Sequence, residues 1–172
     1  MDDHDLGSLA SAGDRWTLTF TRSFPHPPEK VWRAITEDDH LAAWFPQTIV
    51  GERRTGAPLR FVTSDEGDEG FDGEMVVCER PKVLEMTWGT DRLRIELEPD
   101  GEGTRLTLVD TFDELGKAAR DAAGWHECLD RLVVDLDGGR QAALGETWTR
   151  VHPRYVAALG PEASTIGPPG EA

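Results

Sequence analysis

Residues 113–139 read DELGKAARDAAGWHECLDRLVVDLDGG, and this stretch decides the fold. Its apolar residues recur at steps of three and four, which places them in one stripe along a helix. They are Leu115, Ala118, Ala119, Ala122, Trp125, Leu129, Leu132, Val133 and Leu136. Asp113 is expected to cap the start of this helix, and Gly138 with Gly139 is expected to end it. A helix of this length with a single apolar stripe requires a broad apolar surface to pack on.

The composition restricts the classes of partner. The chain has 172 residues, enough for one domain with a sizeable core, and its 33 acidic against 18 basic residues give a formal net charge of −15. Such a surface repels phosphate backbones and anionic lipids, so we expect neither nucleic acid nor a membrane as a partner. The acidic N-terminus lacks the pattern of a signal peptide. Cys78 and Cys128 form no CxxC pair, which argues against a disulfide framework or a zinc site and favours a cytoplasmic protein.

The residues before the long helix supply the apolar surface. Residues 16–22 alternate between apolar side chains and threonine, as a half-buried strand does. Two short helices are expected next, one from Pro27 or Pro28 and one ending before Pro46. Further strands are expected at residues 47–52, 58–63, 71–79, 83–88, 92–98 and 104–112. The apolar residues of these strands share one face, which predicts an α+β domain with a seven-stranded antiparallel sheet covered by the long helix.

The two ends of the chain differ in composition from this region. Residues 1–13 are small and acidic, and we expect them to be disordered. Residues 14–160 are expected to form a single domain, with a helical cap near its end that Pro153 breaks or restarts. Residues 161–172 are rich in proline and glycine and are expected to form a disordered tail.

Five segments carry a family resemblance. They are PPEKVWRAIT (27–36), LAAWFP (41–46), FDGEMVVCERPKVLEMTW (71–88), GTRLTLVDTF (103–112) and GWHECLDRL (124–132). In this order they resemble the helix-grip fold of the START/SRPBCC superfamily, and more narrowly the branch similar to the C-terminal domain of the activator of Hsp90 ATPase. The resemblance covers roughly residues 15–140. It implies a curved sheet wrapped around the long helix, two short helices after the first strand, and a cavity between helix and sheet.

The inward faces of the predicted elements supply the candidate wall of such a cavity. Its apolar candidates are Trp44, Phe45, Phe61, Met75, Met86, Trp88, Leu108, Phe112, Trp125 and Leu129, with Asp110 or His126 as the polar contact. An apolar pocket with one or two polar groups is typical of sites for hydrophobic small molecules. Large aromatic side chains also dominate protein cores, so the same residues either line a cavity or fill it.

The polar candidates differ in the role that their position allows. His126 and Cys128 are two positions apart on a helix and point to different sides, so they cannot share a metal ion. His126 is spaced to pair with Asp130. Asp110 follows Leu106 and Leu108 inward by alternation, where its carboxylate would either bind a hydrogen-bond donor of a ligand or have a pKa raised by desolvation. The alternative is a bulge near the end of the strand that turns Asp110 to solvent. The acidic segment 64–70 lacks the spacing of a calcium loop and is interpreted as solvated charge.

The functional expectation follows from what the sequence contains. It has no nucleophile elbow, phosphate-binding loop, HExxH motif or dinucleotide-binding fingerprint, so it gives no positive indication of catalysis and no cofactor is expected. The first hypothesis is a monomer or homodimer that binds an apolar small molecule in the cavity. The second is a cochaperone-like module that binds a protein. The third is an enzyme of the cyclase or hydrolase kind that uses Asp110 or His126.

Overall fold

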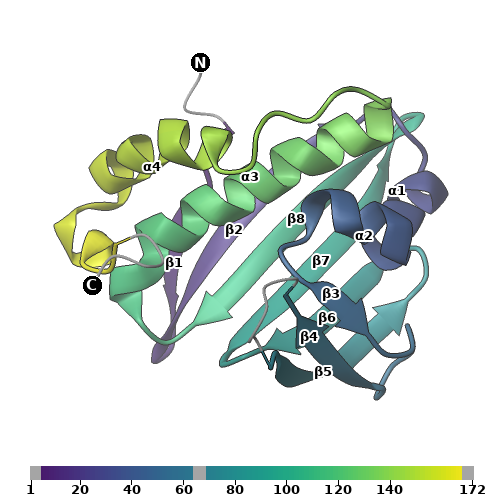
Figure 1. Cartoon of the computed structure of the whole chain (residues 1–172), viewed down its shortest axis with the longest axis horizontal. Coiled ribbons are helices and arrows are strands. Elements are labelled where there is room, and N and C mark those ends of the chain that lie inside the picture. Colours follow the sequence, from purple (N-terminus) through teal and green to yellow (C-terminus); the bar gives the residue numbers. More distant parts are fainter. Residues whose placement is uncertain (1–4, 64–68, 168–172) are drawn as a thin grey trace.

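The computed structural model describes residues 5–63 and 69–167. Within these residues, an eight-stranded antiparallel sheet curves beneath one long helix (Figure 1). The strands lie in the order β1-β2-β8-β7-β6-β5-β4-β3. Their bounds are β1 Ser8–Ala12, β2 Arg15–Phe24, β3 Thr48–Val50, β4 Pro58–Val62, β5 Phe71–Glu79, β6 Val83–Trp88, β7 Asp91–Asp100 and β8 Gly103–Phe112.

The helices lie on one side of this sheet. Two short helices follow β2, the long helix follows β8, and a further helix packs beside the long one (Figure 1). They are α1 Pro28–Thr36, α2 Asp38–Trp44, the 3-10 turn η2 Leu115–Lys117, α3 Ala118–Asp137, α4 Glu146–Leu159 and the 3-10 turn η3 Pro161–Ser164. The expected helix-grip arrangement, with two short helices after a sheet strand and a long helix over the sheet, is therefore confirmed.

The long helix α3 follows the expected apolar stripe but starts later than expected. Its stripe residues Trp125, Leu129 and Leu132 are buried against the sheet, and Gly138 ends the helix in the left-handed conformation at a φ of 73°. Asp113 does not cap the helix. Its carboxylate instead binds Arg15 Nε at 2.6 Å, because β8 runs to Phe112 beside β2 and the chain needs the turn η2 before it can cross the sheet.

Strand β8 confirms the predicted alternation. Leu106, Leu108, Asp110 and Phe112 are all buried on its inner face. The strand pairs with β2 on one side and β7 on the other, in continuous register through Asp110. The alternative of a bulge that would turn Asp110 to solvent is therefore wrong.

The N-terminal segment requires a correction. Residues 8–12 were expected to be disordered, but they form β1 and pair with Arg15–Thr19 of β2. The sheet consequently has eight strands instead of seven. This strand satisfies backbone groups at the edge of β2, and Gly13 with a φ of 65° makes the turn between the two strands. Residues 1–4 lie outside the described part of the chain.

The C-terminal segment is also more ordered than expected. Residues 161–164 form η3, in which Ala163 is buried, and the Ile166 N–H donates to the Gly116 carbonyl at 3.0 Å. Helix α4 continues through Pro153 instead of breaking there. Residues 168–172 lie outside the described part of the chain, so for them the disordered tail stays a prediction.

Replacement of Leu132 by alanine measures how much the stripe stabilises the fold. Leu132 is fully buried, so Leu132→Ala should lower the free energy of unfolding by ~2–5 kcal/mol in a denaturant titration. Leu144→Ala is the matched control, because Leu144 is 82% exposed and its truncation should change stability by less than ~0.5 kcal/mol. Equal losses in the two variants would contradict the packing of α3 on the sheet.

Candidate functional site

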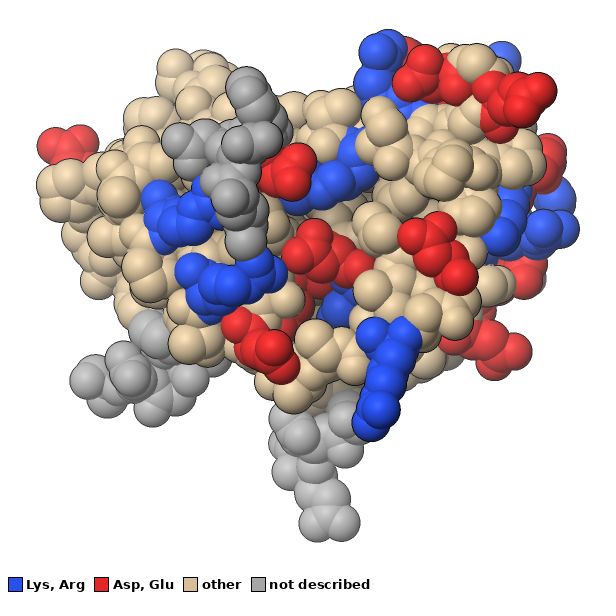
Figure 2. Space-filling model, turned by 90° about the horizontal axis from the view of Figure 1, so that it is seen from above, with Lys and Arg blue, Asp and Glu red and all other residues tan. Residues whose placement is uncertain are grey.

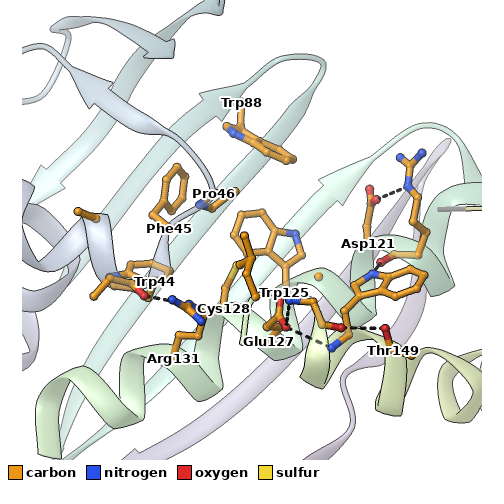
Figure 3. A pocket seen from close by; sticks show the side chains of 17 residues that line it. Trp44, Phe45, Pro46, Trp88, Asp121, Trp125, Glu127, Cys128, Arg131 and Thr149 are labelled. Carbon is orange, nitrogen blue, oxygen red and sulfur yellow. Dashed lines mark hydrogen bonds and ion pairs between the residues drawn. The ribbon is translucent and has the colours of Figure 1, made fainter. Parts of the chain in front are cut away.

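A pocket of about 680 Å³ opens beside α3, on the side that faces α2 and the start of α4 (Figure 3). We call it the α3 pocket. It is lined by Ala42, Ala43, Trp44, Phe45, Pro46, Trp88, Arg120, Asp121, Gly124, Trp125, Glu127, Cys128, Arg131, Leu144, Gly145, Trp148 and Thr149. Its volume falls in the range of sites that hold drug-sized or cofactor-sized molecules.

Aromatic rings form the apolar wall of the α3 pocket. The Trp125 ring lies 6.0 Å from the Phe45 ring and 5.3 Å from the Trp88 ring, measured between centroids. The Trp88 indole N–H donates to Gln47 Oε1 at 2.9 Å, which fixes the orientation of its ring. Edge contacts of this kind hold aromatic side chains in defined positions, so the wall is formed before any ligand arrives.

Helix α3 turns a second face toward this wall. Gly124, Cys128 and Arg131 recur at the spacing of one helical face, and all three border the pocket. A Cβ atom added at Gly124 would meet nothing within 4 Å outside its own helix. The glycine therefore leaves open space in the pocket where any other residue would project a side chain.

The two acidic side chains that line the pocket already have hydrogen-bond or ion-pair partners. Glu127 Oε1 accepts the backbone N–H groups of Gly145 at 2.8 Å and Trp148 at 3.3 Å, at the start of α4. Asp121 binds Arg120 Nε at 2.9 Å and lies 3.4 Å from Lys117 Nζ. A carboxylate at a helix N-terminus is favoured by the helix dipole, so Glu127 ties α3 to α4.

Cys128 borders the pocket without being reactive. Burial raises the pKa of its thiol to about 12, and the neighbouring Glu127 charge acts in the same direction. The nucleophilic form of cysteine is the thiolate. Cys128 therefore contributes apolar surface to the pocket and not a nucleophile.

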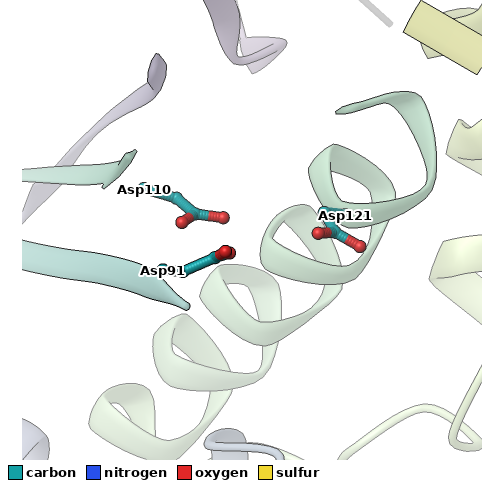
Figure 4. A group of neighbouring side chains, drawn as sticks. All are labelled: Asp91, Asp110 and Asp121. Carbon is teal, nitrogen blue, oxygen red and sulfur yellow. The ribbon is translucent and has the colours of Figure 1, made fainter. Parts of the chain in front are cut away.

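Figure 4 shows a cluster of three carboxyl groups, one of which accepts a hydrogen bond from Trp125 of the aromatic wall. Asp91 from the start of β7, Asp110 from β8 and Asp121 from α3 each offer an oxygen within 4.8 Å of the others, and we call them the acidic cluster. Asp91 and Asp110 are almost completely buried. Lys117 Nζ binds Asp91 Oδ1 at 2.7 Å, so one cation of the chain already sits where these oxygens would hold a metal ion.

Asp110 keeps its proton at neutral pH. Burial, followed by the charge and hydrogen bond of Asp91, raises the pKa of its carboxyl to about 8, against the opposing hydrogen bond from the Trp125 indole. That indole N–H donates to Asp110 Oδ2 at 3.1 Å. Asp110 Oδ1 and Asp91 Oδ2 are buried without another hydrogen-bond partner, and one proton shared between the two carboxyl groups satisfies both.

His126 belongs to a different part of the molecule. Its Nδ1 lies 2.8 Å from the Tyr155 hydroxyl of α4, which also accepts the Gly7 N–H at 2.9 Å. The expected spacing to Asp130 is present, at 3.9 Å from Nε2. Burial, followed by the nearby Arg22, lowers the pKa of the His126 imidazole to about 4. The ring is neutral at physiological pH and joins α3, α4 and the N-terminal segment.

The structure thus divides the residues expected around a cavity into two groups. Trp44, Phe45, Trp88 and Trp125 border the α3 pocket. The others are buried in the core, with Asp110 behind Trp125 and His126 against α4. These core residues are Phe61, Met75, Met86, Leu108, Phe112 and Leu129. They fill the space between sheet and helix, because large side chains from both surfaces meet there.

Sequence reasoning missed the polar half of the pocket. Arg131 and Gly124 lie off the apolar stripe of α3, and Trp148 was assigned only to a helical cap. The available signal was the glycine itself. A glycine inside a strong helical pattern costs about 0.5–1 kcal/mol relative to alanine and therefore calls for a packing or functional reason. The segment 64–70 falls largely outside the described residues, and its interpretation as solvated charge stays a prediction.

Comparisons with known proteins place this architecture. Residues 25–137 match the family described as activator of Hsp90 ATPase homolog 1-like protein. The chain belongs to this family, which confirms the resemblance inferred from the five sequence segments. No curated protein matches the chain.

Solved structures share the fold across most of the chain. A conserved protein of unknown function from Enterococcus faecalis, EF2215, is 22% identical, with a TM-score of 0.75 over 89% of this chain and 90% of that one. CalU16 from Micromonospora echinospora is 19% identical, with a TM-score of 0.69 over 89% and 95% of the two chains. A Bordetella parapertussis protein, encoded by gene BPP1335, is 26% identical, with a TM-score of 0.68 over 87% of each chain.

The buried pair Asp91–Asp110 should make stability depend on pH. An unfolded aspartate has its usual pKa near ~4, whereas folded Asp110 holds its proton up to a pKa of about 8. The folded chain therefore binds more protons between these values, and the free energy of unfolding falls as the pH rises through that window. Asp110→Asn keeps a neutral side chain there at every pH. It should abolish the fall, which is at most ~1.4 kcal/mol per pH unit.

Urea titrations of the wild type and Asp110→Asn at pH 5 and pH 8 measure this difference. Asp14→Asn is the control, because it is the same substitution at an exposed position in the turn between β1 and β2. Wild type and control should lose stability together toward pH 8, relative to Asp110→Asn. Parallel pH profiles for all three proteins would contradict a protonated Asp110.

Proposed function

We propose that this protein binds an apolar small molecule in the α3 pocket. The observation that carries the proposal is Gly124, a glycine in the middle of a long helix whose missing side chain opens directly onto a preformed aromatic wall. A helix of a packed core normally places a larger residue at such a position, because glycine weakens the helix and leaves contacts unmade. An open, apolar hollow with a few oriented polar groups is typical of a ligand site.

The enzyme hypothesis has less support. Of the two residues considered for catalysis, Asp110 lies behind the Trp125 ring and His126 faces α4, so neither borders the α3 pocket. A general acid or base must come within hydrogen-bond reach of the reacting group. The high thiol pKa of Cys128 argues against nucleophilic catalysis at the same site.

A protein partner is the second candidate function. Leu144, at the rim of the α3 pocket, is 82% exposed and is the most exposed of the large apolar side chains among the described residues. An exposed apolar residue beside an aromatic pocket suits an anchor side chain of a bound protein. The family is described by its likeness to an activator of Hsp90 ATPase, which makes a chaperone-like partner the natural candidate for this alternative.

The surface charge supports a small-molecule or protein partner more than a polyanion. Figure 2 shows Lys and Arg interspersed with Asp and Glu on the face seen from above, without one continuous basic patch among the coloured residues. Among residues 5–63 and 69–167, no helix combines the length and apolar character needed to cross a membrane. We propose that the protein acts in the cytoplasm, because the two cysteines of the sequence form no CxxC pair and are typical of a reduced protein.

Filling the gap at Gly124 tests the proposal without unfolding the protein. Gly124→Leu places an apolar side chain into the pocket, and it should raise helix stability by ~0.5–1 kcal/mol because leucine is a better helix former than glycine. It should also weaken the binding of an apolar probe such as 4-phenylbutanol by about tenfold or more, since the probe loses that volume. Calorimetric titration measures the affinity, and a urea titration measures the stability.

Ala157→Leu is the matched control, because it adds the same side chain at an exposed position of α4 that does not border the pocket. This control should bind the probe as the wild type does. If the probe does not bind the wild type, or binds Gly124→Leu as tightly as the wild type, the small-molecule proposal fails. Capture of a protein that needs Leu144 would then favour the second candidate.

A further inference from the structure

Arg131 is the one basic residue of the α3 pocket that has no carboxylate partner among the described residues. Its Nε donates to the Ala43 carbonyl at 3.0 Å and its Nη1 to the Ala142 carbonyl at 3.1 Å. No carboxylate of the described chain pairs with it, although most other arginines there form ion pairs. In a chain with 33 acidic residues, this is an unusual place for a half-buried cation.

The two hydrogen bonds hold the guanidinium in a fixed orientation. Ala43 belongs to α2 and Ala142 to the connection between α3 and α4, so two separate segments of the chain hold the group. A guanidinium has further N–H groups in the same plane, and these have no partner in the described part of the chain. A rigid, planar donor of this kind is suited to a carboxylate, which accepts two parallel N–H bonds.

The other charges of the pocket cannot bind such a carboxylate. Arg120 is occupied by Asp121, which Lys117 also approaches, and Glu127 is occupied by the start of α4. Arg131 is therefore the basic side chain of the pocket that is left to bind a carboxylate, because the Glu127 carboxylate is held by backbone N–H groups at the start of α4. A ligand group that completes the site carries one negative charge and sits at the end of the pocket where α2 meets α3.

The net charge of the protein narrows the ligand further. A chain with a formal charge of −15 repels anions over a long range, and the repulsion grows with the charge of the ligand. A phosphate dianion has two negative charges, so the protein repels it about twice as strongly, and a single arginine must offset that repulsion. A monocarboxylate has one negative charge and is repelled less. An apolar body packed on Trp125 and Phe45 adds affinity to its single contact with Arg131.

We propose that the α3 pocket selects amphipathic monocarboxylates, with the carboxylate bound by Arg131 and the apolar body against the aromatic wall. This inference rests on the proposed binding function and adds the chemical class of the ligand. Arg131 acts as the specificity-determining residue, and the rings that face it supply the contact area.

The test compares two probes that differ only in their end group, 4-phenylbutyrate and 4-phenylbutanol, by calorimetric titration at pH 7.5. The wild type should bind the carboxylate about tenfold or more tightly than the alcohol, as expected for a charge-assisted pair. Arg131→Gln should remove this preference. Arg131→Lys, which keeps the charge but loses the planar fork, should retain part of it.

Arg33→Gln is the matched control, because Arg33 is exposed on α1 outside the pocket and its replacement changes the net charge equally. It should keep the preference of the wild type. Equal affinity of the wild type for both probes would overturn the role of Arg131 and leave the binding function standing, whereas failure of both probes to bind would overturn both. The comparison of the two probes on the wild type can contradict the proposal by itself. The proposal therefore remains testable even if Arg131→Gln does not fold.

Discussion

The burial of one face of α3 on the sheet is the interaction on which the rest of this structure depends. The first turns of the helix carry small residues, Ala118, Ala119 and Ala122, which are fully buried and let the backbone approach the strands closely. Trp125, Leu129 and Leu132 then fill the wider space farther along. The surface they pack on exists only once β2 and β8 have paired, and that pairing joins Trp16 to Phe112. Helix and sheet therefore stabilise each other, and neither buries its apolar face alone.

Because the sheet covers only one face of α3, the other face remains available. Glu127 uses it to hold α4, and Gly124 and Arg131 open it toward α2. One face of the helix is apolar and packs on the sheet. Another face of the same helix mixes polar, charged and small residues and borders the pocket. This division explains how the core can be tightly filled while the same helix borders a hollow.

The two faces differ in how well the sequence predicts them. The apolar stripe and the strand alternation repeat regularly, so they predicted the helix and the sheet, and they offered the inward position of Asp110 beside the alternative of a bulge. Strand β1 was missed because SLASA has no apolar alternation and gains its order from backbone pairing with β2. The sequence could not predict that Asp91 and Asp121 lie close to Asp110, because that proximity depends on the path of the turns between their elements. The pocket face mixes glycine, cysteine and arginine, and no single periodic pattern describes such a set.

Trp125 presents its ring to the pocket and its indole N–H to Asp110. One side chain therefore contacts both the pocket and the buried carboxyl. A ligand that draws the indole away from Asp110 removes a contact that favours the carboxylate, and so raises the proton affinity of that carboxyl. Thermodynamic reciprocity requires the proton to strengthen the binding of the same ligand by an equal factor. Such a ligand would therefore bind more tightly to the protein in which Asp110 is protonated than to the protein in which it is ionised.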